Sequence, residues 1–134
     1  MKRIASAVVT RIGPDYAQSI ATGGFELISD EPVSAGGGNA GPAPYGLVLA
    51  GLGSCTAITL KMYADRKGWD IGTLKVSLTL EKDADGNNLV VRTLSTNAAL
   101  DDTQWHKLIE IAGKTPVTKT LQTGATITAA RARP

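Results

Sequence analysis

One stretch of low polarity, residues 41–60 (GPAPYGLVLAGLGSCTAITL), constrains the fold more than any other feature of the sequence. It is the longest apolar run in the chain and it holds the single cysteine, Cys55. Pro44 stands where a first helical residue can lie, because the N–H that proline lacks would have no partner in the first turn. Nothing forbids a helix from there to about Lys67. The sequence therefore predicts one long central helix, with Gly68 as its stop.

This helix is apolar on nearly every side. One face is formed by residues that follow one another at steps of four and three, namely Val48, Leu52, Cys55, Thr59 and Met62. The opposite side stays apolar until Lys61, which predicts a helix buried nearly all round. Glycines, a serine and threonines interrupt the run. A buried helix of a soluble protein is therefore favoured over a membrane span, which needs about 20 consecutive apolar residues.

Composition sets the class of protein. With 134 residues the chain fits one domain, 1–134, that is long enough for a real core. The net charge is +2 and the basic residues are scattered, which gives little support for nucleic-acid binding. One cysteine and one histidine exclude an intrachain disulfide and a Cys/His zinc set. The first residues lack the apolar core of a signal peptide. We expect a cytoplasmic protein without metal or cofactor.

The remaining chain predicts an α+β fold in the order β-β-β-α-β-β-α-β. Short strands divided by turns indicate an antiparallel meander before the central helix. Alternating apolar and polar residues indicate a hairpin after it, and its second strand loses the apolar phase between Val91 and Leu94, which indicates a bulge or a poorly buried edge. The predicted strands are residues 3–12, 16–21, 25–28, 74–81, 89–98 and 124–129.

The second helix is predicted to begin at Asp101, which forms a capping box with Gln104, and to end at Gly113. A short helical turn is expected behind Pro116. His106 lies off the apolar stripe of the second helix, so we interpret it as a solvated residue rather than a catalytic one.

Two polar loops resemble ligand sites but lack the required residues. The triple glycine at 36–38 is not followed by the Gly-Lys-Ser/Thr of a phosphate-binding loop. The loop 83–88 has two aspartates but no downstream glutamate for a calcium ion. We therefore expect neither a phosphate nor a calcium site.

The central helix needs more cover than one sheet and a short second helix give. Gly46, Gly51 and Gly53 each cost about 1 kcal/mol relative to alanine in a helix interior. Such residues are tolerated where backbones approach closely, as between packed helices. These features predict a homodimer that encloses the helix.

Several motifs resemble those of one known family. They are Asp30-Glu31-Pro32, Gly36-Gly37, Gly41-Pro42-x-Pro44-Tyr45, Leu52-Gly53-Ser54-Cys55-Thr56 and Met62-Tyr63-Ala64-x-Arg66-Lys67-Gly68. Together with the element order, they make the whole chain similar to the OsmC/Ohr family of organic hydroperoxide resistance proteins. The resemblance implies an intertwined homodimer with active sites at the subunit interface. It also implies a cysteine that reduces organic hydroperoxides, becomes a sulfenic acid and then forms a disulfide with a second cysteine. In the family, dithiols such as lipoylated proteins reduce that disulfide.

Cys55 matches the peroxidatic cysteine of this family. The reaction requires a thiolate, and an ordinary free cysteine has a pKa near 8.5. Cys55 is about three turns from Pro44, beyond the reach of the helix N-terminus, and burial among apolar neighbours would raise its pKa. In the family the necessary cation is an arginine that a glutamate positions.

The chain departs from that pattern in three places. The family glutamate falls on Gly46, and the second cysteine falls on Thr115. The family arginine precedes the central helix, but no lysine or arginine lies between Arg11 and Lys61. Arg3, Arg11 or a lysine of the other subunit are the open replacements.

Three functions follow from this comparison. The first is thiol-dependent reduction of organic hydroperoxides through Cys55, with an external thiol or dithiol as reductant. The second is a catalytically degenerate dimer that binds a small apolar or thiol-reactive molecule in the vacated pocket. The third is a structural dimer in which Cys55 is only a small buried hydrophobic residue.

Overall fold

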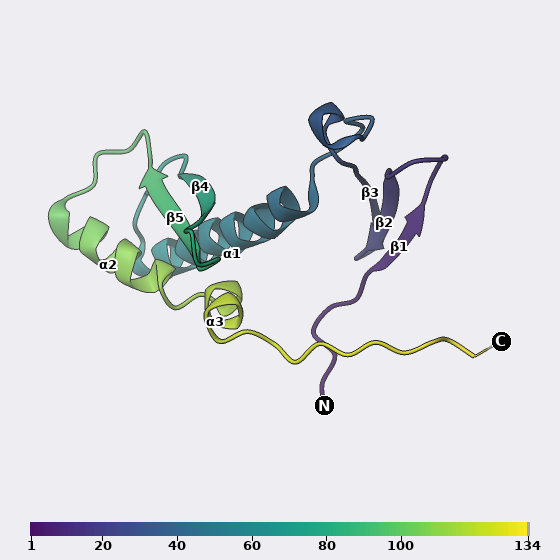
Figure 1. Cartoon of the computed structure of the whole chain (residues 1–134). Helices are drawn as coiled ribbons and strands as arrows, with labels where there is room; N and C mark the ends of the chain where they lie inside the picture. Colours follow the sequence, from purple (N-terminus) through teal and green to yellow (C-terminus); the bar gives the residue numbers. More distant parts are fainter. Residues whose placement is uncertain (134) are drawn as a thin grey trace. The chain divides into compact units, whose positions relative to one another are not determined.

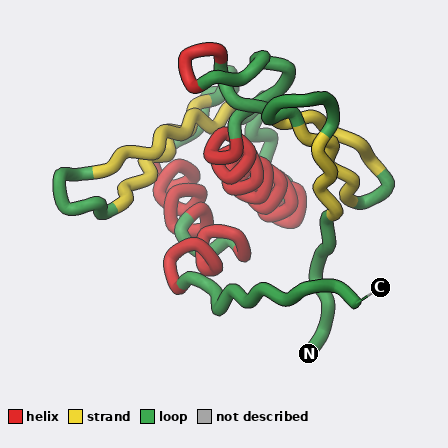
Figure 2. Tube along the Cα trace, turned by 45° about the vertical axis from the view of Figure 1, so that its right-hand side comes forward, coloured by secondary structure: helices red, strands yellow, loops and turns green. Residues whose placement is uncertain are grey.

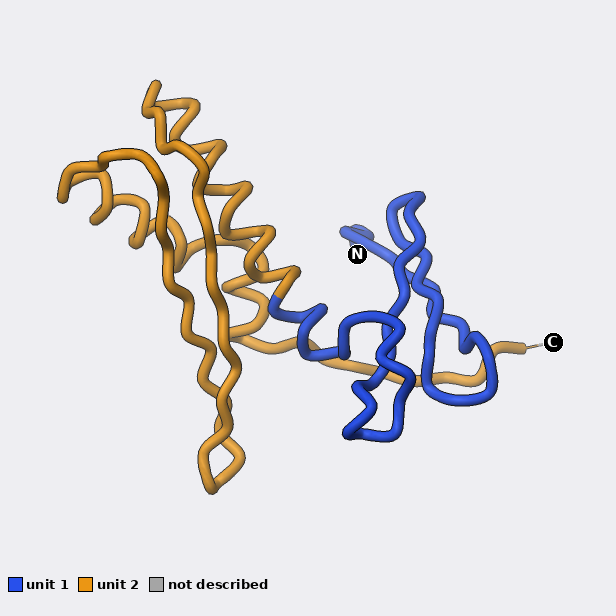
Figure 3. Tube along the Cα trace, turned by 90° about the horizontal axis from the view of Figure 1, so that it is seen from above, with its two compact units in different colours: residues 1–49 blue, residues 50–134 orange. Residues whose placement is uncertain are grey.

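The structure of the chain is a computed structural model that describes residues 1–133. It contains two compact units, Met1–Leu49 and Ala50–Pro134, coloured separately in Figure 3. The elements, labelled in Figure 1, are β1 Val8–Arg11, β2 Gln18–Thr22, β3 Phe25–Ser29, the 3₁₀ helix η1 Val33–Ala35, α1 Pro44–Lys67, β4 Lys75–Lys82, β5 Asn88–Ser95, α2 Asp102–Ala112 and α3 Pro116–Thr123. The α+β class is confirmed. One domain over 1–134 stays a prediction.

The first unit holds the antiparallel meander that the sequence predicts. Strand β2 pairs with β1 on one side and with β3 on the other. The first strand is shorter than the predicted 3–12, because β2 offers backbone partners only to residues from Val8 to Arg11. Of the preceding residues, Ser6 reaches the sheet through its carbonyl, which accepts a hydrogen bond from the Thr22 hydroxyl (2.9 Å).

The loop between β3 and α1 is organised around Asp30, which is 4% exposed. Its carboxylate accepts backbone hydrogen bonds from Glu31 (2.7 Å), Gly38 (3.2 Å) and Ala40 (3.1 Å). Gly37 lies so close to the Glu31 carbonyl that a Cβ atom would collide with it. The polar and glycine residues of this loop thus have a structural explanation in the loop itself.

Helix α1 has the predicted bounds, but it is not buried all round within one chain. Its buried side chains recur every four residues, at Leu52, Thr56, Leu60 and Ala64, which places them on one face. The rest of the helix has little cover, and four large side chains are exposed: Tyr45, Val48, Ile58 and Met62. Within the second unit, the buried face of α1 is the one that packs against the core.

The hydrophobic core of the second unit lies where α1, α2 and the β4–β5 hairpin meet (Figure 1). Buried side chains from the two helices and the segment after α1 form its centre: Leu60, Ala64, Ile71, Leu108 and Ala112. Leu94 of β5 and Leu74, which directly precedes β4, pack against this centre. The capping box of Asp101 and Gln104 begins α2 as predicted.

Strands β4 and β5 pair in a regular antiparallel register from Lys75↔Ser95 to Lys82↔Asn88. The bulge alternative for the return strand is therefore wrong. The poorly buried edge is confirmed, because Leu89, Val90 and Val91 are all exposed.

One of the three α1 glycines has a clear packing role. A Cβ atom on Gly53 would press on the Leu78 side chain of β4. The sequence predicted a close approach to another helix. The close approach found here is to β4, a strand of the same chain. A Cβ atom on Gly51 would meet nothing, and one on Gly46 would make only ordinary contact with Pro42.

The end of the chain differs from the prediction. The expected short turn behind Pro116 is the two-turn helix α3, and residues 124–133 form no strand (Figure 2). The sequence pattern at 124–129 suits a strand, but a strand requires a neighbour with which to pair. No other strand among residues 1–133 pairs with this segment.

Candidate active site

Cys55 lies on α1 as a free thiol and is half-buried. Among residues 1–133, its Sγ has no recorded hydrogen bond, ion pair or other electrostatic partner. It follows Pro44 by about three helical turns, so the partial charge of the helix N-terminus does not reach it. The chain thus presents a nucleophile without any visible activating group.

The positions of the family glutamate and of the second cysteine, Gly46 and Thr115, carry no charge. Gly46 is exposed on the first turns of α1. Thr115 is fully buried at the N-cap of α3, where its hydroxyl lies 2.6 Å from the hydroxyl of Thr118. Of the open replacements for the arginine, Arg3 and Arg11 are exposed and make no recorded polar side-chain contact within residues 1–133.

The residue after Cys55, Thr56, belongs to a buried polar network. The hydroxyl of Thr56 donates to the Leu52 carbonyl (2.7 Å) and accepts a hydrogen bond from Nη1 of Arg92 (2.9 Å). The same Nη1 also donates to the hydroxyl of Thr118 (2.7 Å). Arg92 therefore connects strand β5 with both α1 and α3.

Proton assignment in this network is consistent at every atom. The Thr118 hydroxyl donates to the Ala112 carbonyl (3.3 Å), so it can accept from both Arg92 and Thr115. The Thr56 hydroxyl likewise donates its one proton to the Leu52 carbonyl and accepts one hydrogen bond, from Arg92. No buried side-chain nitrogen or oxygen among the described residues is left without a partner. The threonines are therefore held by the fold.

Arg92 is a residue that the sequence reasoning missed. Position 92 lies on the half-buried face of β5, in register with Leu78 of β4. The interrupted alternation between Val91 and Leu94 was the available signal. The strand does not slip at this point. The apolar pattern is interrupted because an arginine occupies an inward position of a regular strand.

His106 and the loop 83–88 both lie exposed at the surface. His106 is exposed on α2, as expected, and lines a shallow cleft there. Asp83 accepts hydrogen bonds from the backbone of Asp85 and Asn87, both 2.9 Å, and from the Asn87 amide (3.0 Å). These contacts, first among them that of the Asn87 side chain, lower the pKa of Asp83 and stabilise the hairpin loop.

The protein is thus an α+β protein with a half-buried free cysteine on its central helix. A family model described as OsmC-like protein matches residues 36–130. The chain belongs to the OsmC-like protein family, and the resemblance seen in the sequence is confirmed.

Solved structures agree with this assignment. An osmotic stress induced and detoxification response protein from Psychrobacter arcticus 273-4 is 25% identical, with a TM-score of 0.77 over 90% of both chains. The organic hydroperoxide resistance protein OhrB of Bacillus subtilis is 26% identical, with a TM-score of 0.59 over 87% of this chain and 90% of that one. An organic hydroperoxide resistance protein from Legionella pneumophila shares the fold at 15% identity, with a TM-score of 0.63 over 90% and 92%. A comparison with curated proteins gave no match.

Helix α1 is long and apolar enough to cross a membrane by length and composition alone. In this chain its buried face supplies Leu60 and Ala64 to the hydrophobic core. The glycines, serine and threonines within it agree with a packed core helix.

Proposed function

We propose that this protein reduces organic hydroperoxides with Cys55 as its only redox-active thiol. The observation that carries the proposal is the half-buried free thiol of Cys55 on α1 of an OsmC-like chain, in a motif that resembles the one around the family's peroxidatic cysteine. Relatives named as organic hydroperoxide resistance proteins, one of them 26% identical, support it.

The chemistry proceeds in two stages. The Cys55 thiolate attacks the terminal oxygen of the hydroperoxide, the O–O bond breaks, and the alkoxide leaves and takes up a proton to form the alcohol. Sulfur is oxidised to a sulfenic acid. Because Thr115 replaces the second cysteine, an external thiol must attack the sulfenic sulfur and release water. A second thiol equivalent then reduces the mixed disulfide and restores Cys55.

We further propose that the protein acts in the cytoplasm as an intertwined homodimer. The exposed apolar side chains of α1 support the dimer, since Ile58 and Met62 are 53% and 60% exposed within one chain. Exposed apolar surface on a helix of low polarity is typical of an interface. Sedimentation at micromolar concentration should give twice the mass of the chain, and a monomer would contradict the dimer.

The activity is tested by consumption of tert-butyl hydroperoxide with dithiothreitol or dihydrolipoamide as reductant. Wild type should turn over, Cys55→Ser should not, and Ser54→Ala should retain activity because it changes only an exposed neighbouring hydroxyl. A thiol-reactive probe for sulfenic acid should label Cys55 after peroxide. Equal turnover by wild type and Cys55→Ser would contradict the proposal.

A second function is favoured by the missing activating groups. Without a carboxylate at Gly46 and without a cation paired to Cys55, the same fold would serve as a dimeric binding protein for a small apolar or thiol-reactive molecule. In that case Cys55 would react with iodoacetamide no faster than free glutathione at pH 7, and it would remain a thiol in excess peroxide. Fast alkylation and sulfenic acid formation would exclude this second function.

A further inference from the structure

The guanidinium group of Arg92 has unused hydrogen-bonding capacity. Two of its five N–H donors, both on Nη1, bond the hydroxyls of Thr56 and Thr118. No carboxylate among residues 1–133 pairs with Arg92, and no further hydrogen bond to it is recorded there. Its remaining donors lie on Nε and Nη2, which share one edge of the planar group. That edge is the one that binds a carboxylate with two parallel hydrogen bonds.

Arg92 lines a cleft of about 340 Å³ in the second unit, a volume within the range of small-molecule sites. Three apolar side chains contribute to its walls: Leu52, Val90 and Leu121. Its other walls include Asn88, Gln122 and Thr118, and none of the lining residues is acidic. Cys55 does not line the cleft.

The amides add donors beside the guanidinium. The Oδ1 atom of Asn88 already accepts a hydrogen bond from Lys82 Nζ (2.7 Å), so the amide nitrogen is the end of Asn88 that remains to donate. Arg92 is the only charged residue among those that line the cleft. A single guanidinium matches a monoanion, and the apolar walls match an aliphatic chain.

We propose that the cleft binds a small aliphatic monocarboxylate, whose carboxylate pairs with the Nε–Nη2 edge of Arg92 and whose chain lies against Leu52, Val90 and Leu121. The buried threonines hold Arg92 in place before the ligand arrives, which reduces the entropy lost on binding. This binding activity goes beyond the proposed peroxide reduction and does not require the Cys55 thiol.

Binding is tested by calorimetric titration of the full-length protein with acetate, butanoate, hexanoate and octanoate at an ionic strength of about 0.15 M. Octanoate should bind with one site per chain. Affinity should rise along the series by up to about fourfold for each CH₂ group that is buried. Octan-1-ol should bind at least about tenfold more weakly than octanoate, because it cannot form the charged pair.

Two variants and a control locate the site. Arg92→Gln should weaken octanoate binding at least about tenfold, whereas Lys119→Gln, which removes an exposed charge from α3, should leave it within about twofold. Leu121→Trp fills the cleft from an exposed position of α3 and keeps the Arg92 network, so it also should bind at least about tenfold more weakly.

Cys55→Ser should bind octanoate like wild type, which separates this proposal from the peroxidase activity. The proposal is overturned if octanoate fails to bind wild type, or if Leu121→Trp and Arg92→Gln bind it as wild type does. It is also overturned if inorganic phosphate displaces octanoate at equal concentration, because the site would then select charge and not a carboxylate with a chain.

Discussion

Asp30 and Arg92 are charged side chains without a partner of opposite charge among residues 1–133, yet their surroundings differ. Asp30 is 4% exposed and its carboxylate accepts three backbone hydrogen bonds from its own loop. Arg92 is half-buried and uses only one of its nitrogens, bound to two hydroxyls. The Asp30 carboxylate is occupied by the fold, whereas the Arg92 guanidinium is held by the fold through Nη1 and has no partner for its other N–H donors among residues 1–133. The first arrangement is structural and the second suits a ligand.

The largest loss of stability should come from Asp30→Ala. The substitution leaves the backbone N–H groups of Glu31, Gly38 and Ala40 without their acceptor, and it removes the centre of the loop. The midpoint of urea unfolding should fall more than for any other variant considered below. Asp15→Ala, which removes an exposed carboxylate from a turn, should unfold at the wild-type midpoint. Similar midpoints for the two variants would show that Asp30 is dispensable.

Thr118→Val should have the next largest effect. Valine keeps the shape of threonine but removes the hydroxyl that meets Arg92, Thr115 and the Ala112 carbonyl. We expect a loss of about 1–2 kcal/mol of unfolding free energy by urea denaturation, since Arg92 can recover hydrogen bonds from water. Thr120→Val, at an exposed position of the same helix, should lie within about 0.5 kcal/mol of wild type. Equal losses would indicate a helix-propensity effect rather than the network.

The contribution of the Asp30 carboxylate to the free energy of unfolding should depend on pH. Backbone hydrogen bonds, first that of Ala40 and then that of Glu31, lower the pKa of Asp30 below its ordinary value. A lowered folded-state pKa stabilises the fold above the unfolded-state pKa of about 3.9, and this contribution is lost as the pH falls through the folded-state pKa. The difference in urea midpoint between wild type and Asp30→Asn should therefore be full at neutral pH and shrink below about pH 4. A constant difference would contradict the role of the carboxylate.

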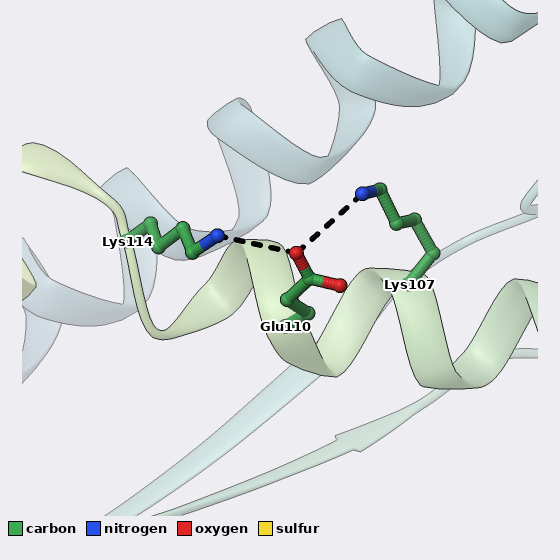
Figure 4. A network of polar contacts seen from close by, with 3 residues as sticks. All are labelled: Lys107, Glu110 and Lys114. Atoms are coloured by element: carbon green, nitrogen blue, oxygen red, sulfur yellow. Dashed lines mark hydrogen bonds and ion pairs between the residues drawn. The ribbon is translucent and has the colours of Figure 1, made fainter.

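The smallest effect should come from Glu110→Gln on α2. Glu110 pairs with Lys114 (3.1 Å) and Lys107 (3.5 Å), as Figure 4 shows, and these contacts, first the hydrogen bond from Lys114, lower its pKa. All three side chains are at least 40% exposed, so water and salt screen the pairs. The urea midpoint should change less than for Thr118→Val and should match wild type in 1 M salt. A large, salt-independent loss would contradict this screening.

Local signals explain which parts of the fold the sequence predicts well. Pro44 and Gly68 bound α1, and Asp101 with Gln104 begins α2, because each signal acts within one turn of the helix that it ends or begins. The strand predicted at 124–129 depends instead on a distant partner, which no periodic pattern identifies.

The two candidate sites differ in the same way: one is evident from the local sequence, and the other depends on contacts between distant residues. Cys55 stands out in sequence as the only cysteine inside the longest apolar run. Arg92 does not, because its role depends on the register of β5 against β4 and on threonines from two helices. Only the folded arrangement brings Thr56 and Thr118 to the same guanidinium nitrogen.

The central claim is that Cys55 reduces organic hydroperoxides without a second cysteine. The most direct measurement is the steady-state rate of tert-butyl hydroperoxide consumption by wild type and Cys55→Ser, with dihydrolipoamide as reductant and mass spectrometry of the intact protein. The account predicts turnover that requires Cys55, with an added oxygen or a mixed disulfide on wild type alone. An unmodified Cys55 thiol in excess peroxide, with no turnover above that of Cys55→Ser, would contradict it.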